Sequence, residues 1–253
     1  MAPRLALALA ISLLASPAGA APGPSRTLRV AAAANVKSAV DELARAFERG
    51  EPGVAVRVTA GASGALVAQL RSGAPFDVFL SADREYPRTV VAAGLAGREE
   101  VYAIGKLALW APPGGLDVGR GLGALRDPAV RKVAIANPAV APYGRAAEAA
   151  LRSAGVLEAI RGKLVLGASA SQAAHFAASG AADAALVPLS LTFEPELARG
   201  RAAVVPPESY PRLEQSAVIL RRAADPELAQ RFFAFVTGEK GRAILAKYGY
   251  ALP

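Results

Sequence analysis

The sequence predicts an α/β fold made of two lobes. Short apolar runs of strand length alternate with helical patterns along nearly the whole chain, an order that favours largely parallel sheets flanked by helices. The alternation occurs in two sets, and no repeat, low-complexity tract or flexible linker separates them. We therefore expect two lobes joined by extended crossings, each with a mixed, mostly parallel sheet flanked by helices, and a ligand cleft between them.

The first set of elements begins with a strand at 28–33 and a helix at 36–49. The apolar positions of this helix form one stripe at helical spacing: Val36, Val40, Leu43, Ala44 and Phe47. The next elements are a strand at 54–59, a helix at 65–71, a strand at 77–81, and a helix with Asp83 as its cap and Pro87 in its first turn. An extended stretch then runs through 101–105 and 107–111.

The second set comprises a strand at 132–136, a helix at 145–154, a strand at 164–166, a helix at 172–178 and a strand at 184–187. A late strand follows at 216–220, then helices at 228–236 and 241–247. Asp225 and Pro226 supply an N-cap and a first-turn proline for the former. We place the first lobe at 27–104 plus 215–253 and the second at 105–214.

The N-terminus has the pattern of a secretory signal peptide. Arg4 supplies a positive charge, residues 5–15 form an apolar run, and residues 16–20 end in the small side chains that signal peptidase reads. The apolar run is too short to cross a bilayer as a mature helix. We expect residues 1–20 to be removed and the protein to be exported, without a lipid anchor because the sequence has no cysteine to acylate.

Composition and charge exclude several classes of function. The chain has 29 Lys and Arg against 21 Asp and Glu, but the basic residues are scattered, which argues against a nucleic-acid partner and fits mild steering of an anion. The absence of cysteine excludes disulfides, thiolate metal sites and cysteine nucleophiles. His175, the only histidine, lies inside a predicted helix, so we expect no enzyme, no cofactor and no free metal ion. Asp77 and Asp83, which flank one strand, are interpreted as an interlobe contact and a cap.

Four short segments share one local pattern, in which a strand or turn ends in small or polar residues and a helix begins at once. They are Ala33-Ala34-Asn35-Val36, Ala62-Ser63-Gly64-Ala65, Ala141-Pro142-Tyr143-Gly144 and Ser169-Ala170-Ser171-Gln172. Helix starts leave backbone N–H groups without internal partners and carry partial positive charge. A single start of this kind is an ordinary cap. Two from each lobe, facing one cleft, would surround an anion with neutral donors.

Longer segments around these starts match a known family in residues and in spacing. They are 30–35, 61–64, 72–83, 137–138, 141–144, 171–172, 180–183 and 247–250, of which 72–83 (SGAPFDVFLSAD) is the most specific. On these segments the sequence resembles the periplasmic molybdate-binding proteins that serve ABC transporters, over essentially the whole mature chain. The resemblance implies a type 2 periplasmic-binding-protein fold, a monomer that binds molybdate or tungstate and delivers it to a membrane permease.

The resemblance also implies which residues hold the oxyanion. Asn35 would donate from its side chain or backbone, and Ser63 from its hydroxyl and its N–H. Tyr143 and Ala170 would donate through their backbone N–H groups, with a weaker role for Ala34. Fixed neutral donors reward an anion of the correct radius, because a smaller anion leaves some of them unpaired.

Two residues depart from the family pattern. Ala34 stands where many members have Ser or Thr, and Pro188 stands where some place a tyrosine hydroxyl, so the donor set is leaner. An iron carrier would cluster its tyrosines, and an amino-acid binder would keep an arginine for the carboxylate; neither feature is present in the four segments. Sulfate differs from molybdate in size rather than charge, so a binding protein for sulfate or another oxyanion remains the alternative.

Overall fold

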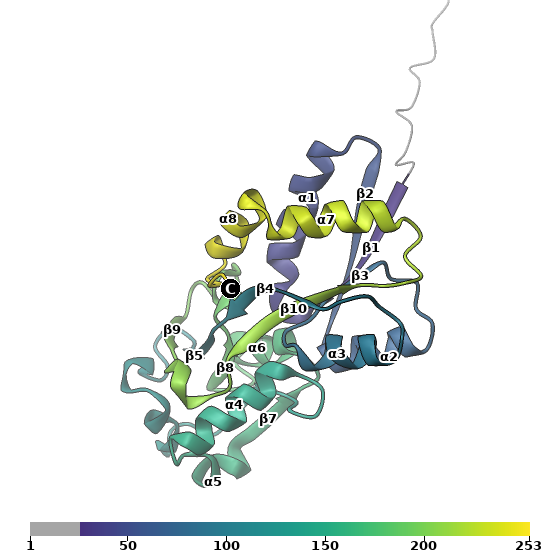
Figure 1. Ribbon diagram of the computed structural model, residues 1–253. Coiled ribbons are helices and arrows are strands. Elements are labelled where there is room, and N and C mark those ends of the chain that lie inside the picture. Colours follow the sequence, from purple (N-terminus) through teal and green to yellow (C-terminus); the bar gives the residue numbers. More distant parts are fainter. Residues whose placement is uncertain (1–25) are drawn as a thin grey trace, which may run out of the picture.

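The computed structural model describes residues 26–253 as two five-stranded sheets, each flanked by helices (Figure 1). The strand order is β2-β1-β3-β10-β4 in the first sheet and β7-β6-β8-β5-β9 in the second. The prediction of an α/β fold with two mixed sheets is confirmed. The predicted signal peptide, residues 1–20, lies outside the described residues. Within residues 26–253, no helix is long and apolar enough to cross a membrane.

The first sheet has a fully buried central strand, β3. Its strands are β1 (Arg26–Ala33), β2 (Val54–Gly61), β3 (Val78–Leu80), β4 (Glu100–Gly105) and β10 (Leu213–Ile219). β1 pairs in parallel with β2 and β3, whereas β10 runs antiparallel to β3 and β4. The helices of this lobe are α1 (Lys37–Gly50), α2 (Ser63–Arg71), α3 (Glu85–Ala92), α7 (Pro226–Thr237) and α8 (Glu239–Lys247).

The predicted apolar stripe of α1 faces this sheet. Val40, Leu43 and Phe47 are buried in one cluster with strand residues of β1 and with Phe232 of α7. The rings of Phe47 and Phe232 meet edge to face, with their centroids 5.3 Å apart. This packing is the physical reason for the helical spacing in the sequence, since only a stripe of this width can bury itself against a sheet.

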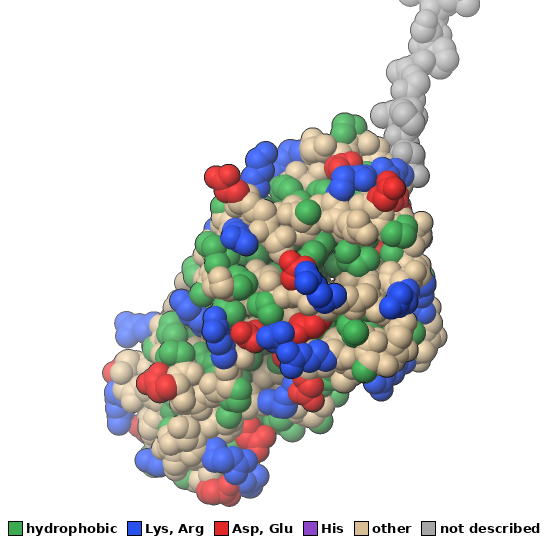
Figure 2. All heavy atoms as spheres, viewed as in Figure 1, with side chains coloured by type: hydrophobic (Ala, Val, Ile, Leu, Met, Phe, Trp, Pro, Cys, Tyr) green, Lys and Arg blue, Asp and Glu red, His purple; other side chains and the backbone are tan. Residues whose placement is uncertain are grey.

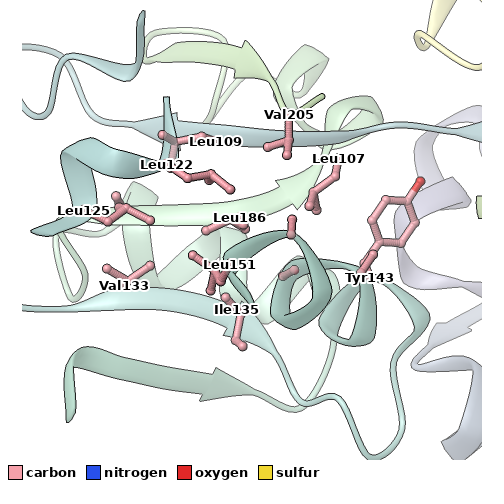
Figure 3. Close-up of a cluster of buried hydrophobic side chains, with 14 of the residues drawn as sticks. Leu107, Leu109, Leu122, Leu125, Val133, Ile135, Tyr143, Leu151, Leu186 and Val205 are labelled. Carbon is pink, nitrogen blue, oxygen red and sulfur yellow. The ribbon is translucent and has the colours of Figure 1, made fainter. Parts of the chain in front are cut away.

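The second sheet repeats the same plan. Its strands are β5 (Leu107–Ala111), β6 (Val133–Ala136), β7 (Leu164–Gly167), β8 (Ala184–Pro188) and β9 (Arg201–Val204), and its helices are α4 (Pro142–Ser153), α5 (Leu157–Ile160) and α6 (Ala170–Ala178). β6 is parallel to β7 and β8, whereas β5 is antiparallel to β8 and β9. Figure 3 shows the side chains of Leu109, Ile135 and Leu186 packed together with Leu151 of α4.

The chain passes between the two sheets twice. β4 of the first sheet ends at Gly105 and β5 of the second begins at Leu107. The return follows β9, and residues 205–212 lead to β10 in the first sheet. Short 3₁₀ turns complete the connections: η1 (Ala34–Val36), η2 (Val118–Arg120), η3 (Leu122–Arg126), η4 (Arg161–Lys163), η5 (Leu189–Phe193) and η6 (Pro207–Ser209).

The structure differs from the expected elements in several places. A short helix that the pattern did not give, α5, follows α4, and α4 and α6 begin two or three residues earlier than expected. The pattern gave no strand at 201–204, where β9 forms the edge of the second sheet. β9 is largely exposed, so it lacks the buried alternation that marks a strand in a sequence. The strand expected at 216–220 begins earlier, at Leu213, and has an irregularity in its register between Gln215 and Ser216.

Candidate functional site

A small cavity lies where elements of the two sheets meet. Its lining residues from the first lobe's elements are Ala33, Ala34, Asn35, Gly61, Ala62, Ser63 and Ala82, and those from the second are Ala141, Pro142, Tyr143 and Ala170. All five residues that the sequence predicts for the oxyanion site, Ala34 included, are among them. No lining residue carries a charge, and only a few carry a polar side chain.

The cavity receives the starts of four helices. Asn35 is the second residue of η1, which continues directly into α1, and Ser63 is the first residue of α2. From the other sheet, Tyr143 is the second residue of α4 and Ala170 the first of α6. At these positions the backbone N–H has no acceptor inside its own helix. The residue before a helix, such as Ala62 before α2 or Ala141 before α4, is in extended conformation and marks the point where the strand or loop gives way to the helix.

Ser63 keeps a hydroxyl proton available to the cavity. The side chain is 1% exposed, and its Oγ accepts a hydrogen bond from the N–H of Ala82 at 3.1 Å. Within residues 26–253 the hydroxyl donates to no acceptor. A hydroxyl that accepts one bond can still donate one, so Ser63 is suited to donate to an anion.

Asn35 has its side chain already engaged. Both hydrogens of the amide are used, since Nδ2 donates to Gln215 Oε1 and to the Tyr250 hydroxyl, each at 2.8 Å. The sequence left open whether this residue donates from its side chain or its backbone. In the structure, the backbone N–H is the donor of Asn35 that these bonds leave for the cavity.

Tyr143 contributes a feature that sequence reasoning missed. Its ring belongs to the core of the second lobe, and its hydroxyl points away from that core (Figure 3). The hydroxyl is buried and has no hydrogen-bond partner within the described chain. A Cβ placed on Gly105 would lie 2.1 Å from this oxygen. The hydroxyl therefore occupies the space beside Gly105, where β4 ends and the crossing to β5 begins. Burial raises the pKa of Tyr143 well above its usual value, which keeps the hydroxyl neutral.

Arg145, the nearest candidate cation in the sequence, is committed to an interlobe contact. Its Nη2 lies 2.5 Å from Asp83 Oδ2 and 3.2 Å from Glu85 Oε2, and its guanidinium stands over the ring of Tyr86. Burial raises the pKa of Asp83, against the lowering effect of the Tyr86 N–H and of Arg145. Arg145 is therefore not a cavity-lining residue but joins α4 to the start of α3.

The other residues singled out in the sequence lie outside the cavity. Asp77 is buried and accepts from the N–H groups of Arg29 and Ala224, so its side-chain hydrogen bonds within residues 26–253 stay inside the first lobe; the expected interlobe contact is made by Asp83 instead. Asp83 also accepts from the N–H of Tyr86, as a cap does. The side chain of His175 is 65% exposed on α6. Pro188 ends β8 and does not line the cavity.

Charge on the surface is mixed. Figure 2 shows Lys and Arg side chains spread over the visible face, with Asp and Glu side chains among them. Many are paired, as in the contacts of Arg84 with Glu99 and of Arg231 with Glu51. The excess of basic residues is thus distributed over this face rather than gathered into one patch.

Known proteins match this chain over nearly its full length. A model of the bacterial extracellular solute-binding protein family matches residues 28–251. The molybdate-binding protein ModA of Azotobacter vinelandii is 39% identical over 253 residues, covering 98% of this chain and 97% of that protein. ModA of Rhodobacter capsulatus is 37% identical, covering 97% of this chain and 94% of that protein.

Solved structures agree with the sequence comparison. The periplasmic molybdate-binding protein of Azotobacter vinelandii matches with a TM-score of 0.83 at 35% identity, covering 89% of this chain and 99% of that one. The sulfate-binding protein SubI of Mycobacterium tuberculosis has the same fold, with a TM-score of 0.71 at 15% identity over 89% of this chain and 86% of that one. The resemblance found in the sequence is confirmed, and the chain belongs to the family of bacterial extracellular solute-binding proteins, together with its full-length ModA relatives.

Proposed function

We propose that this protein binds molybdate in the cavity between its lobes and delivers it to a membrane permease of the ABC type. The observation that carries the proposal is the convergence of four helix starts, two from each lobe, on one uncharged cavity. The naming of two relatives more than 35% identical as molybdate-binding proteins supports the choice of anion.

The proposed donors are the backbone N–H groups of Asn35, Ser63, Tyr143 and Ala170 and the hydroxyl of Ser63, with a weaker contribution from Ala34. Helix starts favour negative charge through their unpaired N–H groups and aligned peptide dipoles. Such donors are fixed in space, so a tetrahedral anion that reaches all of them is bound more tightly than one that reaches only some.

Size is the basis of the proposed selectivity. A lysine or arginine in the cavity would attract any anion, whereas neutral donors at hydrogen-bond distance respond to the radius of the anion. Sulfate is smaller than molybdate and would leave buried donors unpaired, at a cost of roughly 1–3 kcal/mol for each. Tungstate has nearly the size of molybdate, and we propose that the protein binds it too.

The remaining parts of the proposal concern the whole molecule. We propose that lobes 27–104 plus 215–253 and 105–214 close on the anion, and that the protein acts as a monomeric carrier rather than an enzyme, without a cofactor. We also propose that residues 1–20 direct its export to the periplasm and that it has no lipid anchor. Membership in an extracellular solute-binding family supports export and a carrier role.

Calorimetric titration of the purified protein with molybdate, tungstate, sulfate and phosphate tests the proposal. We expect saturable binding of molybdate and tungstate with one site per chain, and much weaker binding of sulfate and phosphate. Tighter binding of sulfate than of molybdate would replace the proposal with the sulfate-carrier alternative.

A further inference from the structure

A network of four buried polar side chains lies behind the cavity wall. Its members are Asn35, Ser190, Gln215 and Tyr250, which are 3%, 5%, 0% and 5% exposed. They come from four separate parts of the chain: the first helix start, η5 of the second lobe, strand β10, and the segment after α8. Of these residues, only Asn35 lines the cavity.

The network holds Asn35 at two points. Its amide Nδ2 donates to Gln215 Oε1 and to the Tyr250 hydroxyl. Its backbone carbonyl accepts from Ser190 Oγ at 2.7 Å and lies 2.8 Å from the Tyr250 hydroxyl. The Tyr250 hydroxyl is also 3.1 Å from Ser190 Oγ. Because Tyr250 has a single hydroxyl proton, it donates to one of these two oxygens at a time.

Gln215 extends the network to a second part of the cavity wall. Its Nε2 donates to the carbonyls of Ala82 and Leu213, each at 3.0 Å. Ala82 lines the cavity and donates its own N–H to Ser63 Oγ. Gln215 stands at the register irregularity of β10, close to the return crossing from the second lobe. One glutamine thus connects both donor segments of the first lobe to the crossing.

Tyr250 is itself held in place as a neutral group. Burial raises its pKa far above the usual value for tyrosine, and the neighbouring Ser190 and Asn35 lower it only in part. Its N–H is bonded to the carbonyl of Leu245, and the following Ala251 exchanges backbone hydrogen bonds with Ile104 of β4. The hydroxyl therefore stays protonated and fixed beside Asn35.

We propose that Tyr250, together with Gln215 and Ser190, positions the N–H of Asn35 for the oxyanion and thereby sets the selectivity of the site. This inference rests on the proposed function, since it concerns the same cavity. The amide and the carbonyl of Asn35 are both fixed, so the backbone of this residue cannot rotate to follow a smaller anion. Ser190 adds a contact from the second lobe, which forms only when that lobe lies against the Asn35 turn. None of the three touches the anion; they act through Asn35.

The test is the substitution Tyr250→Phe, which removes one hydroxyl and keeps the ring. One amide hydrogen of Asn35 is then left buried without an acceptor, and the turn is free to relax. We expect the Kd for molybdate to rise severalfold, because the relaxed turn must be ordered again when the anion binds. We also expect selectivity to fall: the ratio of the Kd for sulfate to the Kd for molybdate should be smaller in the variant than in the unmodified protein.

Tyr248→Phe is the matched control, because its hydroxyl lies two residues away and is bonded to Glu42 at 2.9 Å. We expect this variant to match the unmodified protein in Kd and in selectivity. Circular dichroism and thermal melting of each variant establish that it is folded. If Tyr250→Phe does not fold, Ser190→Ala takes its place, with an expected rise in Kd of several fold and the same loss of selectivity.

The outcomes separate the inference from the proposed function. A folded Tyr250→Phe variant with unaltered Kd overturns the positioning role, while molybdate binding by the unmodified protein and the control upholds the function. A raised Kd with unchanged selectivity also overturns it, because that result indicates general weakening rather than positioning. If the unmodified protein does not bind molybdate, the function and the inference are both wrong.

Discussion

Removal of the Ser63 hydroxyl is the sharpest perturbation of the proposed site. In the substitution Ser63→Ala the hydroxyl oxygen, which is buried and accepts from the N–H of Ala82, is lost. Two consequences follow, one for the anion and one for the free protein. They are measured separately, because binding of the anion depends on the hydroxyl proton and the stability of the free protein on the hydroxyl oxygen.

The loss for the anion comes from the hydroxyl proton. A hydrogen bond to a charged group contributes about 1.5–3 kcal/mol, so the Kd for molybdate should rise by roughly 10- to 150-fold. The unpaired N–H of Ala82 is present in both the free and the bound variant and therefore largely cancels in the Kd. It acts on folding instead, where one unsatisfied buried donor costs about 1–3 kcal/mol and lowers the Tm of the free protein.

Calorimetry supplies the Kd and differential scanning supplies the Tm of the free protein. Ser179→Ala is the control, because the hydroxyl of Ser179 lies at the exposed end of α6 and, within residues 26–253, bonds only to the carbonyl of Phe176. The control should change neither quantity. If Ser63→Ala lowers the Tm but leaves the Kd unaltered, Ser63 is a structural residue and the donor assignment is wrong.

Three further predictions concern the lobes. Arg145→Gln removes the ion pair with Asp83 across the cleft; because the pair is partly exposed, molybdate release measured by stopped flow should accelerate only about two- to fivefold. Tyr143→Phe removes a buried hydroxyl without a partner, so the Tm of the free protein should stay the same or rise, while the Kd changes little since the proposed donor is the backbone N–H. Trp110, the only tryptophan, shares a buried cluster with Ala170 of the cavity, so its fluorescence should change saturably as molybdate is added.

Each of these predictions has a result that contradicts it. Unaltered release from Arg145→Gln would show that the ion pair does not hold the lobes together. A large rise in Kd for Tyr143→Phe would mean that the hydroxyl, and not only the backbone, contacts the anion. Constant emission of Trp110 during binding proven by calorimetry would place this residue outside the part of the lobe that responds to the anion.

The helix starts could be predicted from the sequence because their signals are local. Small residues before a helix, such as Ala62 before Ser63, specify a turn into a helix start within a few positions. The order of strands and helices then places the starts at the carboxyl ends of strands, where open α/β sheets bind ligands. Local spacing and chain order were sufficient to find the four segments that meet at the cavity, whereas the single residues Asn35, Ser63, Tyr143 and Ala170 were named from the resemblance to the family.

The network behind the cavity could not be predicted in this way. Asn35 and Tyr250 are separated by 215 positions and Asn35 and Gln215 by 180, so no local pattern connects them. The sequence indicated Asn35 as a donor with two options, and only the long-range contacts show that its side chain is already in use. The Tyr143 hydroxyl was missed for the same reason, since only the folded chain brings it beside Gly105.

A crystal structure of the protein with bound molybdate tests the central claim most directly. We expect one anion in the cavity, with its oxygens at about 2.7–3.0 Å from the backbone nitrogens of Asn35, Ser63, Tyr143 and Ala170. We also expect that no lysine or arginine side chain touches the anion. An anion bound elsewhere, or one held in the cavity by a charged side chain, would contradict selection by uncharged donors.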